Sequence, residues 1–454
     1  MANLHHQAAK EKQIIENRHY YFNSNKPNSN PISPITREQA LELHEAIKQS
    51  HPDSFIWGHN SFKIINLAGY IRLSSVAIEI VPKISRKDND GDTNTARKVL
   101  LDMLYHSGYC NIHLSTASQL HAAKYNIFEL IGYVFAERLK RELSRGAIAY
   151  YVQAEDNLSV LRGKLLIKQH MINIAFGTGK VYCQYDEFSM DNPLNRTLKQ
   201  ALILLSKEIT NSRTLSLLRS CLTYFADIDE NKVVIGDNER FKFDRSKSRF
   251  EPLFNLATLL LAGRTAFHTS GRKKNFALLF SMDKLYEQYV TAAFQACGLG
   301  YQIRGQEKFP FLKNGDGRTV HSIQPDIVLR KSSKSAIILD TNIILDTKWK
   351  IFKDKIQRED YFQMYVYMMQ HEAEVGVLLY PCTDDCADGG KKGNFTNDCK
   401  SGAETKWKVK YEFTGPTAGR YLYAFDVCYA DFKKAKAQCK GAIEKICNNR
   451  QQNA

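Results

Sequence analysis

Apolar positions along the chain follow two spacings, and each spacing predicts a different kind of element. In the first hundred residues, short runs rich in β-branched and aromatic residues, separated by Gly and Ser, cover 55–57, 63–67 and 76–83. Beyond residue 95, apolar residues mostly recur every three or four positions, as in the stripe over 127–139. A β-rich segment is therefore predicted to precede a mainly helical one.

A third pattern begins near residue 280, where helical and extended segments alternate. Helices are predicted over 284–290 and 360–370. Strands are predicted over 324–329, 336–350 and 375–381. The order helix, strand, strand, helix, strand indicates a separate α/β domain in the C-terminal part of the chain.

These patterns predict a multidomain α+β protein with four parts. Residues 1–35 are polar and end in a stretch rich in Asn, Ser and Pro, so we expect a flexible N-terminal segment. Residues 36–94 are expected to form a β-rich domain, and residues 95–275 a mainly helical middle region with a β hairpin over 147–168. Residues 276–454 are expected to form the α/β core.

The charge balance changes the picture by suggesting a partner. The chain has 63 Lys and Arg against 48 Asp and Glu, a formal net charge of +15, which attracts polyanions such as nucleic acid. An ordinary basic protein is the alternative. No apolar run reaches the roughly 18 residues of a membrane span, and no leader pattern opens the chain, so a cytoplasmic protein without membrane contact is expected.

The ten cysteines are spread through a long chain, so reduced thiols are the expected state. Cys382, Cys386 and Cys399 lie in a polar loop and could ligate a structural zinc ion. Their spacing is not that of a standard paired knuckle. Ordinary reduced cysteines are therefore the preferred interpretation.

Candidate chemistry lies on the strands of the C-terminal part, where polar residues interrupt apolar runs. Asp326 lies on one predicted strand, and Asp346 and Lys348 lie two positions apart on the next. Alternation along a strand makes Asp346 and Lys348 project from one face toward Asp326, with Thr347 pointing away. Two carboxylates can hold Mg²⁺, which polarises a phosphate and activates a water, while the lysine steadies the attacking water or the developing charge.

Two neighbouring carboxylates leave alternatives open. Asp340 could replace Asp346, because residues 338–342 nearly repeat the pattern, but Asn342 stands where Lys348 stands in the second copy. Asp346 is preferred because the lysine is needed for the chemistry. Glu287, on the preceding helix, is either a metal ligand or a solvated face residue.

Further candidates flank these three residues. Gln363 and Tyr367 lie one helical turn apart and could meet the active site or the DNA backbone, although tyrosines that pack into the core are the alternative. Trp349 and Lys350 are expected to cover the site and contact phosphate, with packing and solvation as the alternatives.

Taken in order, these motifs resemble a known family. Asp326, Asp346, Lys348 and the Gln-x-x-x-Tyr helix resemble one branch of the PD-(D/E)xK nuclease superfamily. The chain is more specifically similar to the McrC family, the nuclease subunits of McrBC methylcytosine-dependent restriction systems. The resemblance covers roughly residues 55–381 and rests on the segments 77–83, 161–165, 185–196, 346–350 and 360–367.

The resemblance implies a Mg²⁺-dependent DNA endonuclease subunit with Asp326, Asp346 and Lys348 as catalytic residues. It implies two partners: an McrB-like AAA+ GTPase hexamer, stimulated by the amino-terminal part of this chain, and double-stranded DNA with modified bases. Partner contact would then belong to the β-rich domain. The chain lacks a Gly-x-x-x-x-Gly-Lys-Ser/Thr loop, so no bound nucleotide is expected. The alternatives are a non-catalytic regulatory subunit of the GTPase and a stand-alone RecB-like repair nuclease.

Overall fold

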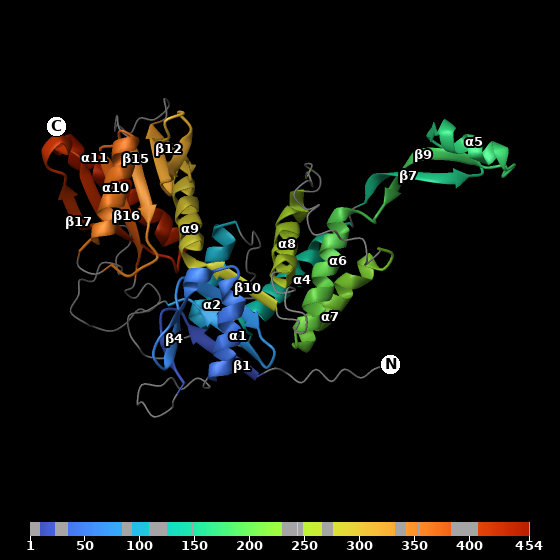
Figure 1. Cartoon of the computed structure of the whole chain (residues 1–454), viewed down its shortest axis with the longest axis horizontal. Coiled ribbons are helices and arrows are strands. Elements are labelled where there is room, and N and C mark those ends of the chain that lie inside the picture. Colours follow the sequence, from blue (N-terminus) through green and yellow to red (C-terminus); the bar gives the residue numbers. More distant parts are fainter. Residues whose placement is uncertain are drawn as a thin grey trace. The chain divides into compact units, whose positions relative to one another are not determined.

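The chain forms two compact units, shown in the computed structural model of Figure 1: residues 1–127 together with 273–454, and residues 128–272. The predicted division into four parts stays a prediction. The first compact unit contains both the β-rich part and the α/β part of that division. The structure describes residues 10–22, 35–83, 93–108, 125–146, 149–228, 243, 248–265, 276–331, 342–352, 355–382 and 407–453.

The first unit opens with a four-stranded sheet of order β1-β6-β5-β10. Its strands are β1 (Lys10–Ile15), β6 (Val76–Val81), β5 (Leu67–Arg72) and β10 (Phe276–Ser281). β1 is parallel to β6, and the other pairs are antiparallel. Five of the six residues of β5 and all of β6 are buried, as their apolar sequences require.

The N-terminal strands differ from the expected flexible segment over 1–35. β1 pairs with β6 along its whole length, and Ile14 on it is fully buried. The strand was not recognised in the sequence because the first half of β1 is charged. An edge strand tolerates such polar side chains, whereas a central strand would not. A second strand, β2 (His19–Tyr21), joins the small sheet β2-β4-β3.

The small sheet contains β3 (Phe55–Trp57), at a predicted run, and β4 (Ser61–Ile64). The predicted run 63–67 instead spans the end of β4 and the first residue of β5. Helix α1 (Arg37–Lys48) contacts β3 and begins at a capping box formed by Thr36 and Gln39. Helix α2 (Thr93–His106) contacts β6 and helix α9 (Met282–Ala296). The first unit is therefore of the mixed α/β kind throughout.

A six-stranded sheet of order β11-β14-β15-β16-β18-β17 forms the rest of this unit. The central strands β15, β16 and β18 are parallel, and the outer pairs are antiparallel. The strands are β11 (Tyr301–Gly305), β14 (Ile327–Lys331), β15 (Ile343–Thr347), β16 (Val375–Pro381), β18 (Tyr421–Val427) and β17 (Trp407–Glu412). A short hairpin of β12 (Phe309–Lys313) and β13 (Thr319–Ile323) lies between β11 and β14 along the chain.

Helix α10 (Arg358–Gln370) packs on this sheet through Met364 and Met368, which join a buried cluster with Ile344 and Leu378. Gly376 on β16 permits the close approach, because a Cβ there would lie 2.6 Å from the Met368 sulfur. Helices α9 and α11 (Phe432–Asn453) contact each other, and α11 contacts β18. The predicted elements occur as α9, β14, β15, α10 and β16, but β11, β12 and β13 stand between α9 and β14, so the predicted order omitted three strands.

The second unit combines helices with an arm of strands. The helices are α4 (Ile127–Ser144), α6 (Pro193–Glu208), α7 (Ser212–Leu222) and α8 (Glu251–Thr265). β7 (Tyr150–Leu158) and β9 (Val181–Ser189) form a long ribbon that carries α5 (Ile167–Ala175) at its far end (Figure 1). We call residues 150–189 the arm.

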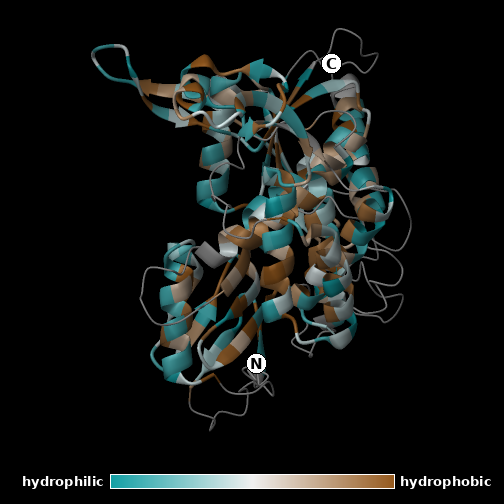
Figure 2. Ribbon diagram, turned by 90° about the vertical axis from the view of Figure 1, so that its right-hand side faces the viewer, coloured by the Kyte–Doolittle hydropathy of each residue, from teal (hydrophilic) through white to brown (hydrophobic). Residues whose placement is uncertain are grey.

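The hairpin expected within residues 147–168 does not form, because the strand in this range pairs with a later one. β7 pairs along its full length with β9, and the two-residue β8 (Lys164–Leu165) pairs with β9 as well. The pairing of β7 with β9 satisfies nine residues of backbone at once, whereas β8 offers only two residues before α5 begins. Figure 2 shows many apolar residues on the strands, whereas the helices carry both apolar and polar residues. Among the described residues, no helix is long and apolar enough to cross a membrane.

Candidate active site

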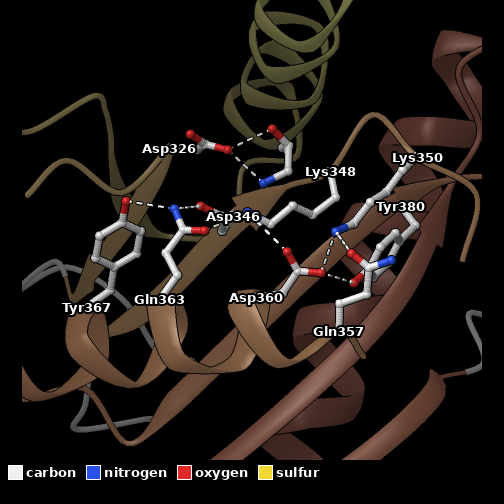
Figure 3. Close-up of polar contacts among 10 residues, drawn as sticks. Asp326, Asp346, Lys348, Lys350, Gln357, Asp360, Gln363, Tyr367 and Tyr380 are labelled. Atoms are coloured by element: carbon white, nitrogen blue, oxygen red, sulfur yellow. Dashed lines mark hydrogen bonds and ion pairs between the residues drawn. The ribbon is translucent and has the colours of Figure 1, made fainter. Parts of the chain in front are cut away.

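The predicted site residues meet at one end of the pair β14 and β15. The last backbone pair of this ladder is Ile327 with Leu345, so Asp326 lies just outside β14 beside the end of β15. Lys348 N donates to the carbonyl of Leu379 at 2.9 Å, which continues the strand one residue past β15. Figure 3 shows the side chains of Asp326, Asp346 and Lys348 gathered there.

Lys348 is held between a carboxylate and an amide. Its Nζ lies 2.6 Å from Asp346 Oδ2 and donates to Gln363 Oε1 at 2.8 Å. Gln363 Nε2 donates to the Tyr367 hydroxyl at 2.9 Å and reaches Asp346 Oδ1 at 3.5 Å. The structure thus brings together Asp346, Lys348, Gln363 and Tyr367, and a helix of the predicted spacing supplies the last two.

Asp326 is oriented by a residue that was expected to point away. Its Oδ2 accepts hydrogen bonds from both the backbone N and the hydroxyl of Thr347, each at 2.7 Å. Successive N–H groups of a strand point to opposite neighbours, and that of Thr347 faces β14 beyond the end of the ladder. Asp326 occupies this position and satisfies the donor, so the expectation that Thr347 faces away was wrong.

The carboxylates of the site are difficult to ionise. Burial, and then the neighbouring Asp326, raise the pKa of Asp346 to about 7 against the lowering effect of Lys348. Burial also raises the pKa of Asp326, although its bonds to Thr347 oppose the shift. Burial opposes a charge on Lys348, but Asp346 and Asp360 raise its pKa. A proton or a bound cation would offset the negative charge that these carboxylates carry when they are ionised.

Glu287 of α9 shares this electrostatic environment. Burial, and then Asp326, raise its pKa to about 7. Its side chain accepts a hydrogen bond from Gln306, which in turn accepts from Gln324 Nε2 at 2.5 Å. Glu287 is therefore half-buried and bound to the chain, rather than a freely solvated face residue.

The donor set fits a magnesium ion in part. Asp346 Oδ2 is buried and accepts no hydrogen bond among the described residues, despite the nearby Lys348. In the described part of the chain, no group of three or more His, Cys, Asp or Glu side chains is arranged to hold a metal. Mg²⁺ commonly takes one or two carboxylates and completes its shell with water and substrate phosphate. Asp326 and Asp346 fit that pattern, and Glu287 is not needed as a third ligand.

Asp360, on α10, was missed as a site residue. It is buried, and its oxygens lie 3.8 Å from Lys348 Nζ and 2.6 Å from Lys350 Nζ. Its spacing of three residues to Gln363 and seven to Tyr367 places all three on one helix face. This periodicity was readable in the sequence and would have revealed it.

Lys350 and Trp349 take different directions. Lys350 Nζ also donates to Gln357 Oε1 at 2.9 Å, and the residue lines a cavity of about 470 Å³ with Lys355 and Arg358. Trp349 instead donates its indole N–H to Glu16. Contact of Lys350 with phosphate stays a prediction.

Some predicted residues lie outside the described part of the chain. These are Asp340, the alternative to Asp346, and Cys386 and Cys399. Cys382 is described and buried. The zinc alternative therefore stays untested.

Comparison with known proteins identifies a family and finds solved structures of similar fold. The model of the family described as McrBC 5-methylcytosine restriction system component matches residues 62–381. A chain of the refined half-complex from the tetradecameric assembly of Thermococcus gammatolerans McrB AAA+ hexamers with bound McrC is similar in fold. The similarity covers 96% of this chain and 100% of that one, with a TM-score of 0.66 and 17% identity.

A chain of the cryo-EM structure of the Thermococcus gammatolerans McrBC complex also matches, at 19% identity and a TM-score of 0.48. That match covers 64% of this chain and 89% of the other. No curated protein matches.

Proposed function

This chain belongs to the McrBC 5-methylcytosine restriction system component family, and from that premise we propose that it is the DNA-cleaving, McrC-like subunit of such a system. The observation that carries the proposal is the convergence of Asp326, Asp346 and Lys348 beside Gln363 and Tyr367. A purely regulatory subunit would have no need for two buried carboxylates with raised pKa values.

The chemistry follows from what each side chain can do. When bound, Mg²⁺ would polarise the scissile phosphate and lower the pKa of an attacking water. Asp326, fixed by Thr347, and Asp346 would hold the ion. Lys348, steadied by Gln363, would place its ammonium group against the charge that develops on the phosphate.

The surroundings of the site suit a DNA backbone. Lys350, Lys355 and Arg358 line the cavity next to Asp360, and the whole chain has a formal charge of +15. Such groups attract phosphates without reading bases. We therefore propose that this cavity accepts the phosphodiester chain beside the bond that is cut.

The arm is the best candidate for contact with an McrB-like AAA+ ring. It exposes several large apolar side chains that a free surface would not retain: Tyr151, Ile167, Met171, Ile172, Ile174, Phe176 and Phe188, each more than half exposed. The T. gammatolerans structure contains McrB hexamers with bound McrC. Partner contact by the β-rich domain, which the sequence suggested, stays a prediction beside this one.

The test is plasmid cleavage by the chain with its purified AAA+ partner, GTP and Mg²⁺. Asp346→Ala and Lys348→Ala should each lower cleavage by about a thousandfold or more, because each removes chemistry and leaves the scaffold. Lys440→Ala, an exposed lysine of α11, is the matched control and should cut normally.

Stimulation of GTP hydrolysis, measured beside cleavage, distinguishes a nuclease subunit from a purely regulatory one. The Asp346→Ala and Lys348→Ala chains should still raise the GTPase rate as the wild type does. Normal cleavage by Asp346→Ala would contradict the site. A wild-type chain that stimulates the GTPase but never cuts DNA would favour the regulatory subunit instead.

A further inference from the structure

A buried hydrogen bond joins the N-terminal strand β1 to the segment that carries the candidate lysine. Glu16 directly follows β1 and is 3% exposed. Its two carboxylate oxygens accept from the indole Nε1 of Trp349 at 2.9 and 3.1 Å. Trp349 directly follows Lys348, so two residues 333 positions apart in sequence meet beside the candidate site.

Glu16 is a rigid partner for this bond. Its backbone N donates to the Val81 carbonyl at 2.9 Å, and its Oε2 accepts from Lys83 N at 3.3 Å. The next residue, Asn17, donates to the Ile64 carbonyl at 2.6 Å and has a left-handed φ of 64°. The backbone at Glu16 and Asn17 is thus bound to β6 of the four-stranded sheet and to β4 of the small sheet.

Burial of this carboxyl is costly unless it is hydrogen-bonded. Burial raises the pKa of Glu16 to about 7, and the Trp349 N–H and nearby Lys83 act in the opposite direction. A polar atom kept at this cost points to a requirement for its geometry. The bond lies on the wall of a cavity of about 310 Å³ that Lys63 and Lys350 also line.

The indole of Trp349 is clamped on its other sides by aromatic rings. Its centroid lies 5.4 Å from that of Tyr286 and 5.6 Å from that of Tyr429. Tyr286 is fully buried on α9, directly before Glu287. The two ring contacts and the bond to Glu16 hold the indole in place, and Trp349 is the residue directly after Lys348.

We propose that Glu16 is a positioning residue for the nuclease site: it holds the Trp349 indole and thereby places the Lys348 ammonium between Asp346 and Gln363. The inference rests on the proposed function of the chain. It makes β1, at the edge of the N-terminal sheet, a part of the cleavage machinery. Loss of the bond should lower the rate of the chemical step and leave DNA binding nearly unchanged.

The experiment uses the full chain with its AAA+ partner, GTP, Mg²⁺ and plasmid DNA. Four variants are compared with the wild type: Glu16→Ala, Glu16→Gln, Trp349→Phe and the double variant Glu16→Ala with Trp349→Phe. Trp349→Phe keeps the packing on Tyr286 and Tyr429 but removes the donor. Glu42→Ala is the control, because Glu42 is a glutamate of the same N-terminal part that bonds Ser74 instead.

Glu16→Ala and Trp349→Phe should each lower kcat by about tenfold with KM for DNA within twofold, since small displacements of a reacting group cost rates of this order. Glu16→Gln should restore most of the rate, because its amide oxygen still accepts the indole proton. The double variant should be no slower than either single variant. Glu42→Ala should cut as the wild type does.

A wild-type kcat in Glu16→Ala, or losses that multiply in the double variant, would overturn the positioning role alone. If Glu16→Ala and Glu42→Ala lose kcat equally, and each loss follows a fall in melting temperature, the Glu16–Trp349 bond only stabilises the fold and has no positioning role. A wild-type chain that does not cut at all would overturn the proposed function, and this inference with it.

Discussion

At the scale of single residues, the candidate site is a series of contacts that runs from Asp346 through Lys348 and Gln363 to Tyr367. The sequence predicted Asp326, Asp346, Lys348, Gln363 and Tyr367, and the structure places them together. Their catalytic roles stay predictions. The residues that support them were not visible in the same way, because their partners come from distant parts of the chain.

Glu16 illustrates this limit. Nothing near it in sequence indicates a partner 333 residues away, and the polar segment around it suggested flexibility. Asp360 is different, since its place on the Gln363 face of α10 could have been read from helical periodicity. A contact between residues distant in sequence could therefore not be predicted, whereas a residue on the same helix face could have been.

The raised pKa of Asp346 predicts how stability depends on pH in the absence of metal. A pKa of about 7 in the folded chain, against 3.8 ordinarily, means that the folded state binds the proton more tightly than the unfolded chain. Stability from this group is therefore greatest at low pH and falls as pH rises from about 4 through about 7. In EDTA, Asp346→Asn should raise Tm by several degrees at pH 8 and change it little at pH 4.

Thermal melts of wild type and Asp346→Asn across this pH range measure the effect. Asp316→Asn, at the exposed turn between β12 and β13, serves as the control and should leave the profile of the wild type unchanged. A Tm difference that is the same at pH 4 and pH 8 would show that burial of the Asp346 charge is not the cause.

At the scale of elements, strongly periodic segments were predicted well. The helical stripe over 127–139 lies in α4, and the runs at 55–57 and 76–83 contain β3 and β6. β1 was missed because its charges suit an edge strand, and the partner of β7 was misplaced because pairing with β9 skips a helix. The pattern of apolar positions indicates whether a segment is a helix or a strand, but it does not indicate which strands pair with each other.

The exposed face of the arm yields a prediction of its own. Replacing Met171 and Phe176 by serine should abolish binding to the AAA+ ring, because both are more than half exposed and their loss removes apolar contact area. Folding should be unaffected, since neither contributes to the core. Size-exclusion chromatography with the ring, together with stimulation of GTP hydrolysis, measures the outcome.

Leu41→Ser, at another exposed apolar residue, is the control for general loss of surface hydrophobicity. Leu41 lies on α1, within the β-rich part that the sequence analysis assigned to the partner. If Leu41→Ser loses binding and the arm variant does not, partner contact returns to that part.

At the scale of the whole molecule, the charge of +15 predicts weak and general attraction to DNA. Affinity of the isolated chain should fall by about tenfold or more between 50 and 200 mM salt, because phosphate contacts release counterions. It should be the same for methylated and plain duplexes, since backbone contacts do not read bases. Binding curves on matched duplexes at several salt concentrations measure both. A strong preference of the chain alone for methylated DNA would place recognition in this subunit.

The pairing of β5 with β10 has a consequence for synthesis of the chain. β10 begins at Phe276, roughly two hundred residues after β5 ends at Arg72. At synthesis rates of about 5–20 residues per second, the edge of β5 that pairs with β10 stays unpaired for on the order of 10–40 seconds. During that time the ribosome-bound chain presents an apolar strand with an unpaired edge, which readily joins other strands. Folding without misassociation over this interval therefore depends on a chaperone that shields the edge of β5 until Phe276 has emerged.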